Sequence, residues 1–358
     1  MKLGIACNHF GFSGGMENYT LNLIKAFHKQ GLPHPVVFAK SFDESLQEFS
    51  FITPQSIPTF GVPRLFKDFF FSYQLRKSRE KFGVDVLLGC CRNDQSEIIL
   101  CGGTHAGYLS QCCLREGLYD KFCLSLEEKE YSNAKKIIAH SRSIKNELIN
   151  FYGVDQDKIE VLYPPVDFSI FSRPTEEEER QLLRQKFGIK EGTISVLFVS
   201  SSHKRKGFEL LEKLFENTSL PIELLVAGRP IPKKPYKNIR YLGYLKNIQE
   251  AYQAVDLSIL ASRYEPFGLA PIESLCAGTP VIISANLGAA EVIKTEVKFE
   301  FTPNSLVSLE KSLKEAISSL RVTRQLIKKE RVSDLFTENL DPEIHASKIY
   351  NFAQKVIR

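Results

Sequence analysis

The sequence predicts two α/β domains, each built on a parallel sheet covered by helices. Short apolar runs rich in strand formers alternate with helical segments along the 358 residues, and this alternation is typical of parallel sheets. The length exceeds what one hydrophobic core usually supports. Pro164 and Pro165 interrupt the alternation, and because proline ends both strands and helices they predict a hinge. We therefore expect an N-terminal domain over residues 1–165 and a C-terminal domain over 166–340, facing each other across a cleft.

The composition is that of a soluble globular protein, with 43% hydrophobic and 25% charged residues. The formal net charge of +5 is too small to indicate nucleic acid by itself, and no nucleic-acid-binding signature is recognisable. No apolar run reaches the roughly 18 residues that a membrane-spanning helix needs. The first ten residues read as a strand rather than a signal peptide. We expect a cytoplasmic protein without a nucleic-acid partner.

Eight cysteines occur without a C-x-x-C motif or the histidine spacing of a zinc site. Reduced, mostly buried thiols are therefore expected, and no metal site is predicted.

The stretch from Asp256 to Ser284 predicts a strand, a loop, a helix and a second strand. Its two apolar ends read as buried parallel strands. Between them, Gly268 is suited to cap the start of a helix and Gly278 to end it in the left-handed conformation. The helix then begins at the carboxyl edge of a sheet, where open α/β sheets bind ligands. Its unpaired N–H groups would attract an anion.

Two carboxylates, Glu265 and Glu273, flank this helix start and would repel a phosphate. Both features fit a ligand with hydroxyl groups on either side of a diphosphate. One glutamate would then accept hydrogen bonds from a sugar and the other from a ribose, while the amides of Phe267, Gly268 and Leu269 hold the phosphates. That ligand is a nucleotide sugar. The alternative is that Glu265 only favours the helix dipole and Glu273 is a solvated helix residue.

A basic pair, Arg205 and Lys206, follows the apolar run Ile194–Ser200. The pair lies in a loop between a strand and a helix, where Gly207 permits the turn. Because this loop is expected at the same sheet edge as Glu265, the pair can supply the cations that a diphosphate requires. A solvated basic pair with no ligand is the alternative.

The order of these residues resembles a known family. Arg-Lys-Gly is followed by two glutamates separated by seven residues, with Phe-Gly-Leu between them and Cys-Ala-Gly-Thr-Pro-Val after them. This order resembles the E-x7-E signature and donor site of the retaining GT-B glycosyltransferases of family 4, in particular the lipopolysaccharide core glucosyltransferases. The resemblance implies two Rossmann-like domains, an N-terminal one for the acceptor and a C-terminal one for the donor. It also implies that a last helix, residues 341–358, crosses back to the N-terminal domain.

The resemblance adds further candidate residues. Gly14 and Gly15 do not form the G-x-G-x-x-G dinucleotide motif, but glycines let a backbone approach a ligand closely, and such a first loop in the family reaches the donor diphosphate and the acceptor. His105 follows a predicted strand, and in the family a residue there lies beside the reacting sugar. Tyr244 and Leu245 correspond to a loop that contacts the nucleobase, largely through its backbone. The alternatives are a tight turn for the glycines and a structural loop role for His105.

Residues 64–81 mix aromatic and basic side chains, as a basic amphipathic helix does. Such a helix would hold the protein peripherally on the anionic inner face of the cytoplasmic membrane. The alternative is a helix packed on the sheet by its aromatic face, with a solvated basic end. The preceding residues 41–63 carry three prolines with little periodicity and predict a loop.

The expected function is a metal-independent, retaining hexosyltransferase. It would move a sugar from a nucleoside diphosphate sugar, foremost a UDP-sugar, to a hydroxyl of a lipopolysaccharide-core or other lipid-linked glycan, with no cofactor beyond this co-substrate. The expected catalytic residues are His105, Arg205, Lys206 and Glu265, with the two cations stabilising the departing diphosphate. The alternatives are a GT-B-like sugar-nucleotide epimerase or phosphorylase, and a non-catalytic nucleotide-sugar or membrane-binding module.

Overall fold

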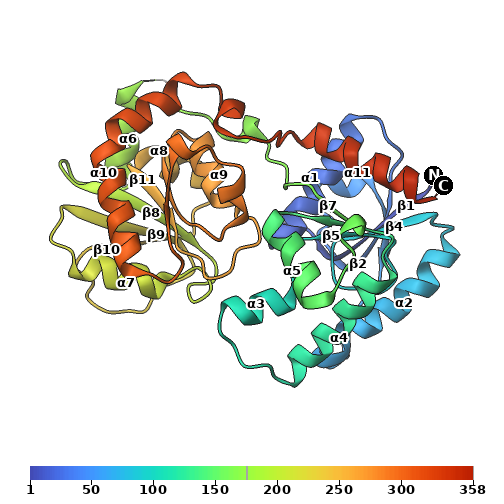
Figure 1. Cartoon of the computed structure of the whole chain (residues 1–358). Helices are drawn as coiled ribbons and strands as arrows, with labels where there is room; N and C mark the ends of the chain where they lie inside the picture. The colour runs from blue at the N-terminus through green and yellow to red at the C-terminus, as the bar shows by residue number, and fades with distance from the viewer. Residues whose placement is uncertain (175, 358) are drawn as a thin grey trace. The chain divides into compact units, whose positions relative to one another are not determined.

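A computed structural model describes residues 1–174 and 176–357, which form two compact units (Figure 1). The first unit contains Met1–Pro165 and the chain from Leu340 onwards, and the second contains Val166–Asn339. Each unit is a parallel sheet flanked by helices, so both are Rossmann-like α/β structures. Thr175 and Arg358, which fall inside the predicted domain ranges, lie outside the described residues.

The sheet of the first unit has seven strands in the order β3-β2-β1-β4-β5-β6-β7. The strands are β1 (Leu3–Phe10), β2 (Val36–Phe42), β3 (Thr53–Ser56), β4 (Val86–Gly89), β5 (Ile98–Cys101), β6 (Lys136–Ala139) and β7 (Ile159–Val161). The helices are α1 (Gly15–Lys29), α2 (Lys67–Lys81), α3 (His105–Gln111), α4 (Leu118–Asn133), α5 (Arg142–Tyr152) and α11 (Pro342–Ile357). Because the strand order reverses between β1 and β4, the loops after these two strands border one crevice at the carboxyl edge.

The loop prediction for residues 41–63 is wrong for Thr53–Ser56, which form β3. This strand pairs with β2 alone and lies at the edge of the sheet. An edge strand forms ladder hydrogen bonds on one side only, so it tolerates Pro54. Pairing with β2, rather than strand propensity, decides its conformation.

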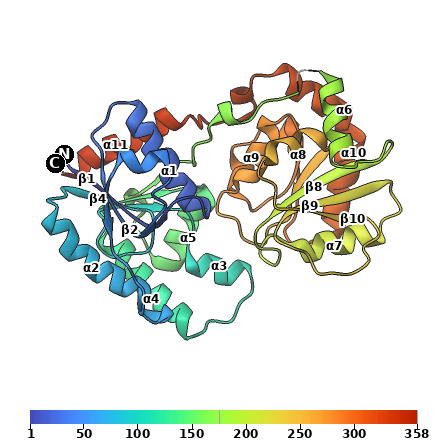
Figure 2. The same ribbon diagram turned by 180° about the vertical axis from the view of Figure 1, so that it is seen from behind.

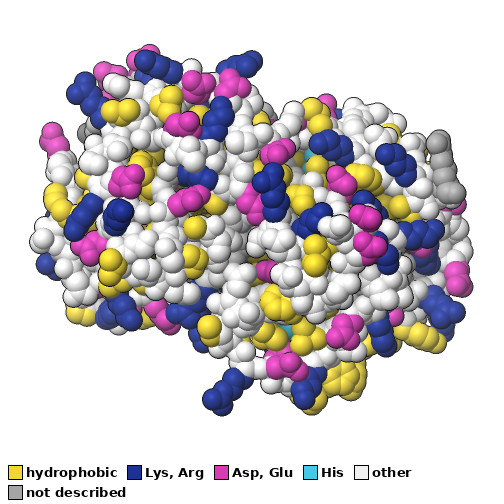
Figure 3. All heavy atoms as spheres, in the orientation of Figure 1, with side chains coloured by type: hydrophobic (Ala, Val, Ile, Leu, Met, Phe, Trp, Pro, Cys, Tyr) yellow, Lys and Arg dark blue, Asp and Glu magenta, His cyan; other side chains and the backbone are white. Residues whose placement is uncertain are grey.

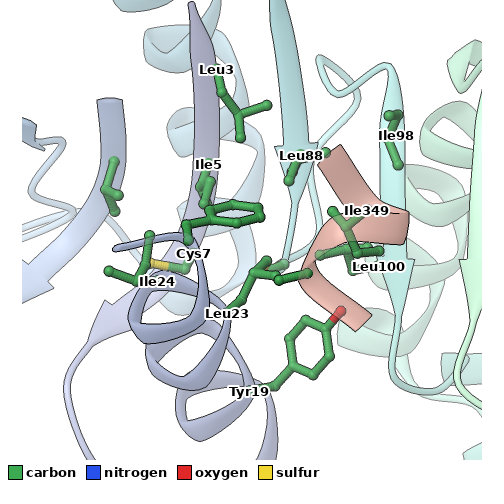
Figure 4. Packing of buried hydrophobic residues seen from close by; sticks show 14 of the residues in the cluster. Leu3, Ile5, Cys7, Tyr19, Leu23, Ile24, Leu88, Ile98, Leu100 and Ile349 are labelled. Carbon is green, nitrogen blue, oxygen red and sulfur yellow. The ribbon is translucent and has the colours of Figure 1, made fainter. Parts of the chain in front are cut away.

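The core of the first unit includes the last helix of the chain. Leu23 of α1, Leu88 of β4 and Leu100 of β5 pack in one cluster with Ile349 of α11, which is fully buried (Figure 4). Each large aliphatic side chain buried in this way contributes about 1.5–3 kcal/mol. The hydroxyl of Tyr19 in α1 also lies 2.6 Å from His345 Nε2 in α11. The predicted return of the last helix to the N-terminal domain is confirmed.

The predicted amphipathic segment forms α2, which begins at Lys67 after a short 3-10 turn over Arg64–Phe66. Its buried side chains include Phe71 and Leu75, which pack against the sheet. The ring of Phe69 contacts that of Phe122 in α4, so the two helices lie side by side (Figures 1 and 2). The helix is therefore packed on the sheet by part of its aromatic side chains, while Tyr73, Arg76 and Lys77 on the same helix remain exposed.

The sheet of the second unit has six strands in the order β10-β9-β8-β11-β12-β13. The strands are β8 (Ile194–Ser200), β9 (Ile222–Gly228), β10 (Ile239–Gly243), β11 (Leu257–Leu260), β12 (Val281–Ser284) and β13 (Lys298–Phe301). The helices are α6 (Glu177–Lys186), α7 (Phe208–Asn217), α8 (Ile248–Ala254), α9 (Leu269–Cys276) and α10 (Leu306–Lys329). Figure 2 shows α7 beside β9 and β10. Here the strand order reverses between β8 and β11.

Charges of both signs are interspersed on the face of the molecule shown in Figure 3. Within the described residues, no helix combines the length and the apolar character needed to cross a membrane.

Candidate functional site

The residues singled out in the C-terminal half gather at the carboxyl edge of the second sheet. The loop after β8 carries Arg205 and Lys206, and the loop after β11, its neighbour across the strand-order reversal, carries Glu265. Tyr244 follows β10, at the sheet margin. Three strand spacings separate β10 from β11, a span of about 14 Å. Open α/β sheets bind ligands at such a reversal.

Backbone contacts join the loop after β8 to the loop after β11. The amide of Arg263 donates to the carbonyl of Arg205 over 2.9 Å. Gly207 has a φ of +78°, and a Cβ at this position would lie 1.9 Å from the carbonyl oxygen of Ala261. A glycine is therefore required for the close approach that places the basic pair beside the second loop.

Arg205 and Glu265 form an ion pair with each other. Arg205 Nη1 lies 2.9 Å from Glu265 Oε2 and also donates to the carbonyl of Tyr264 over 2.9 Å. The hydroxyl of Ser262 donates to the same Glu265 oxygen over 3.3 Å. The sequence predicts that Arg205 contacts a diphosphate and that Glu265 contacts a sugar or a ribose, whereas the structure pairs the two side chains with each other. A guanidinium has five N–H donors, so this pairing leaves it the capacity for further contacts.

Lys206 lies close to Glu273, the second glutamate of the motif. Its Nζ donates to the carbonyl of Val199 over 3.2 Å. Burial raises the pKa of Glu273, while the positive charge of Lys206 and a hydrogen bond from Tyr252 oppose that rise. The Tyr252 hydroxyl donates to Glu273 Oε2 over 3.3 Å. The side chain of Glu273 is thus half-buried and hydrogen-bonded to Tyr252, rather than freely solvated.

Helix α9 begins directly beside this pair of loops. Gly268 is its N-cap, with a φ of +88°, and Leu269 is its first residue. A Cβ on residue 268 would lie 3.0 Å from Glu265 Cγ, so glycine lets the helix start approach that carboxylate. Phe267 is buried, and its carbonyl accepts a hydrogen bond from Ala289 over 2.8 Å. The predicted helix start at this sheet edge is confirmed.

The two residues expected near a nucleobase have different environments. The side chain of Tyr244 is 84% exposed. The side chain of Leu245 packs against the core cluster of the second unit. The side chain of Leu245 therefore serves packing, and what this residue can offer a ligand is its backbone.

His203 also joins the loops at this edge, and sequence reasoning missed it. Its Nδ1 lies 2.9 Å from Ser200 Oγ, and its Nε2 lies 3.0 Å from the carbonyl oxygen of Arg229. These contacts join the loop after β8 to the loop after β9. Its place two residues before Arg205, in the loop after a predicted strand, was the available signal in the sequence.

In the first unit, Gly14 and Gly15 lie at the corresponding strand-order reversal. Gly14 is the N-cap of α1. A Cβ on Gly15 would meet no described atom within 4 Å. Gly15 borders a cavity of about 380 Å³, whose lining includes the ends of β4 and β5 and the charged residues Glu17, Asp68, Arg92, Glu127 and Glu130. The space at Gly15 is open, whereas a Cβ on Gly14 would lie 2.7 Å from Glu17 Oε2.

His105 is the first residue of α3 rather than part of a loop. The hydroxyl of Thr104 caps this helix by accepting a hydrogen bond from the amide of Gly107 over 3.0 Å. His105 Nε2 lies 2.8 Å from Asp120 Oδ1, and the His105 amide donates to Glu127 Oε2 over 2.9 Å. Capping by Thr104 replaces the expected loop with a helical turn.

A chain of charges fixes the surroundings of His105. Lys40 pairs with Asp68 at 2.6 Å, Asp68 with Arg92 at 3.2 Å, and Arg92 with Glu127 at 2.7 Å. Hydrogen bonds from Gly117 and His105 hold the pKa of Asp120 below its usual value. Sequence reasoning missed Asp120 and the acids that hold this helix start, because they lie far from His105 along the chain. His105 is not part of the lining of the cavity beside Gly15.

Within the described residues, no group of three or more His, Cys, Asp or Glu side chains is arranged to hold a metal ion. The Asp155-Gln156-Asp157 segment has the form of an Asp-x-Asp motif, but the side chain of Asp155 accepts a hydrogen bond from the amide of Asp157 over 3.0 Å. The segment is a turn before β7, at the opposite sheet edge from the crevice.

Comparison with known proteins identifies the family. Residues 13–169 match the family described as Glycosyltransferase Family 4, and residues 179–332 match glycosyl transferases group 1. A probable transglycosylase of Burkholderia thailandensis is 40% identical over 321 residues, which cover 90% of this chain and 88% of that protein. The chain belongs to glycosyltransferase family 4.

More distant relatives of this glycosyltransferase are matched over about half their length. A D-inositol 3-phosphate glycosyltransferase of Xylanimonas cellulosilytica is 25% identical over 189 residues, covering 48% of this chain and 45% of that protein.

Solved structures show the GT-B fold. WaaG, a glycosyltransferase involved in lipopolysaccharide biosynthesis, superposes with a TM-score of 0.77 at 17% identity, covering 97% of this chain and 99% of WaaG. Sucrose-phosphate synthase of Thermosynechococcus elongatus superposes with a TM-score of 0.78 at 18% identity, covering 99% of this chain and 98% of the synthase. HepE of Anabaena in complex with UDP-glucose superposes with a TM-score of 0.75 at 17% identity, covering 99% of this chain and 100% of HepE. The predicted family and GT-B fold are confirmed.

Proposed function

We propose that this glycosyltransferase moves a hexose from a nucleoside diphosphate sugar, foremost a UDP-sugar, to a hydroxyl of a lipopolysaccharide-core or other lipid-linked glycan, with retention at the anomeric carbon. The observation that carries the proposal is the convergence of Arg205, Lys206, Glu265 and the start of α9 at the strand-order reversal of the second sheet. The structure of HepE with UDP-glucose supports a UDP-sugar as the donor.

The charged groups at this sheet edge contact different parts of the donor in this proposal. Glu265 offsets the charge of Arg205 through the 2.9 Å ion pair, so Lys206 and the amides of Gly268 and Leu269 are the first groups that a diphosphate meets. Each charge-assisted hydrogen bond contributes about 1.5–3 kcal/mol net. Two such contacts to a diphosphate are enough to decide micromolar affinity.

The same groups stabilise the leaving group during transfer. Negative charge grows on the diphosphate as the bond to the sugar breaks, and pre-placed N–H donors stabilise that charge without reorganisation. Glu265, oriented by Arg205, accepts hydrogen bonds from the sugar, and Glu273 accepts them from the ribose. His105 is the hydrogen-bonding group of the first unit in this proposal. The proposed displacement occurs on one face of the sugar and uses no metal.

A peripheral contact with an anionic membrane is part of the proposal. The side chains of Phe60, Phe66, Tyr73 and Leu118 are exposed, and Arg64, Lys67, Arg76 and Lys77 belong to the same region of α2 and its preceding turn. Figure 3 shows hydrophobic and basic side chains close together beside α4. Such a mixture suits the headgroup region of an anionic bilayer and would place the enzyme at the inner face of the cytoplasmic membrane.

The test is thermal unfolding with UDP-, GDP- and ADP-sugars, each with and without Mg²⁺ or Mn²⁺, and with NAD as a control. A ligand at one hundred times its Kd adds about 2.7 kcal/mol, which shifts Tm by several degrees. A metal-independent shift with one nucleotide sugar supports the donor site. No shift with any sugar, or a shift with NAD alone, contradicts it.

Turnover assays then separate the proposed reaction from its rivals. Product from the donor alone indicates an epimerase, and phosphate-dependent release of sugar phosphate indicates a phosphorylase. Donor binding without turnover on any glycan acceptor indicates a non-catalytic module.

A further inference from the structure

A second pocket, rich in cations, lies at the amino edge of the second sheet. It has a volume of about 270 Å³ and is bounded by the start of α6, the turn at Gly278 after α9, and the C-terminal half of α10. Its walls carry five cations, Arg173, Arg180, Arg321, Arg324 and Lys328, against the carboxylates of Glu176 and Glu177. The amino edge is opposite the edge that carries Lys206 and Glu265, so this pocket is distinct from the proposed donor site.

Positive charge exceeds negative charge around this pocket. Asp256 lies beneath the pocket and forms two ion pairs. Its Oδ1 lies 2.6 Å from Arg180 Nη2, and its Oδ2 lies 3.0 Å from Arg184 Nη1. Arg324 donates to the carbonyls of Val255 and Asp256. Burial, together with the nearby charge of Arg180, lowers the pKa of Arg324 to about 10. One carboxylate is therefore shared between two guanidinium groups, and a third guanidinium contacts its backbone.

Arg173 has buried N–H groups that the protein does not satisfy. Its Nη1 donates to the carbonyls of Ile327 and Glu330 at the end of α10, over 2.5 and 2.7 Å. Its Nε and Nη2, like the Nε of Arg180, are buried and have no partner in the described part of the chain. A buried donor without a partner is unfavourable, and a bound acceptor would satisfy it.

We propose that this pocket binds a phosphoryl anion, either a free phosphate or diphosphate or the phosphate of a lipid headgroup. The planar guanidinium fork matches phosphate oxygens in geometry and charge. The cavity is slightly smaller than the roughly 300–1,000 Å³ of pockets for drug-sized ligands, which favours a small anion. A ligand held by Arg173, Arg321 and Arg324 would connect the segment before α6 to α10, and so stabilise the second unit.

The first experiment titrates inorganic pyrophosphate into the full chain by calorimetry. The titrated protein is the Lys206→Ala variant, because this substitution should weaken pyrophosphate binding at the proposed donor site. We expect one binding site in this background. Arg321→Glu should weaken its Kd at least tenfold, because Arg321 lines the pocket and is exposed enough to be replaced without disturbing the fold.

The matched control is Lys311→Glu, the same charge reversal on the same helix, at an exposed position outside the pocket lining. It should leave the Kd within twofold. Arg173→Lys keeps the charge but removes the unsatisfied guanidinium N–H groups, so it should also weaken binding, with circular dichroism confirming that the variant is folded.

A second arm measures co-sedimentation of the same variants with phosphatidylcholine vesicles that contain phosphatidic acid. Binding of pyrophosphate that depends on Arg321 supports a free anion as the ligand. Binding to vesicles alone, again dependent on Arg321, supports a lipid phosphate. Absence of binding in both arms overturns the proposal, and so does an equal loss in Arg321→Glu and Lys311→Glu, since that result reports only net charge.

Discussion

Glu265 obtains its orientation from two neighbours, Arg205 and Ser262, which donate to the same carboxylate oxygen over 2.9 and 3.3 Å. Oε2 receives both hydrogen bonds, while a carboxylate has about four lone-pair sites in all. Glu265 therefore retains acceptor capacity for sugar hydroxyls. In this arrangement Arg205 positions the carboxylate in addition to any contact with phosphate.

A double-mutant cycle measures this coupling. We expect Arg205→Gln and Glu265→Gln to be non-additive in the free energy of unfolding by about 1–2 kcal/mol, because the side chains are only 27% and 15% exposed. Urea unfolding of the two single variants and the double variant gives the value. The matched control is the pair Arg331 and Asp334, in which the arginine is 85% exposed; its coupling should be close to zero. Equal coupling in both cycles would contradict the positioning role of Arg205.

Lys206 is the residue whose loss should most directly weaken leaving-group stabilisation. Lys206→Ala should lower kcat about a hundredfold, which corresponds to about 2.7 kcal/mol of transition-state stabilisation, and circular dichroism should show that the variant is folded. Steady-state transfer or donor hydrolysis with the nucleotide sugar identified by thermal unfolding provides the measurement. Lys204→Ala is the control, because Lys204 belongs to the same loop and is exposed. Comparable turnover in the two variants would remove Lys206 from the catalytic site.

At the scale of elements, the site depends on how closely the loops after β8 and β11 approach. The backbone hydrogen bond between Arg263 and Arg205 and the glycine at position 207 fix that approach. Because the loops follow neighbouring parallel strands, a shift of either loop moves the basic pair away from Glu265. The proposed donor site is therefore expected to be sensitive to backbone changes that touch no ligand.

Gly207→Ala should destabilise the second unit and weaken nucleotide-sugar binding at least tenfold. The new Cβ would lie 1.9 Å from the carbonyl oxygen of Ala261, and the left-handed backbone adds a strain of about 1–2 kcal/mol. Gly192→Ala is the control for backbone strain alone. Gly192 has a similar φ of +74°, but an added Cβ there would meet no described atom within 4 Å. Urea unfolding and donor titration compare the two variants. Equal losses of stability in both would show that the contact with Ala261 is unimportant.

At the scale of the whole molecule, the two ends of the chain meet in the first unit. Helix α11 packs on α1, and a buried cluster of Tyr19, His140 and His345 lies at their contact. Burial lowers the pKa of both His140 and His345 to about 3. The attachment of the last helix is therefore linked to proton binding.

We expect this attachment to weaken as the pH falls below about 6.5. An unfolded histidine has a pKa near 6.5, and the folded values are lower, so the unfolded state binds more protons and the stability contribution is lost on acidification. The loss amounts to about 1.4 kcal/mol for each imidazole between neutral pH and pH 5.5.

Urea unfolding of the wild type and His345→Gln at pH 7.5 and pH 5.5 measures the effect. The variant should lose less stability than the wild type over this interval. Burial raises the pKa of Glu130, which acts with the opposite sign, so the difference between the two proteins is the informative quantity. An identical loss in both would exclude His345 as the origin.

The sequence by itself determined the fold class and the sheet edge that carries the basic pair and the two glutamates of the motif. Strand and helix periodicity, the caps at Gly268 and Gly278 and the proline pair at Pro164-Pro165 are local signals, each set by interactions within a few residues. Local signals were sufficient to predict a parallel α/β architecture and a helix that starts beside Glu265. The family resemblance added the return of the last helix.

Only the tertiary structure decided how the site residues pair. Arg205 bonds to Glu265, 60 residues away, and His105 bonds to Asp120, 15 residues away. The edge strand β3 likewise exists because β2 lies next to it. These contacts depend on which strands are neighbours and how far each loop reaches, and periodicity along the chain does not encode those distances. The folded structure brings the charges together, and it thereby determines that Arg205 is the cation that pairs with Glu265.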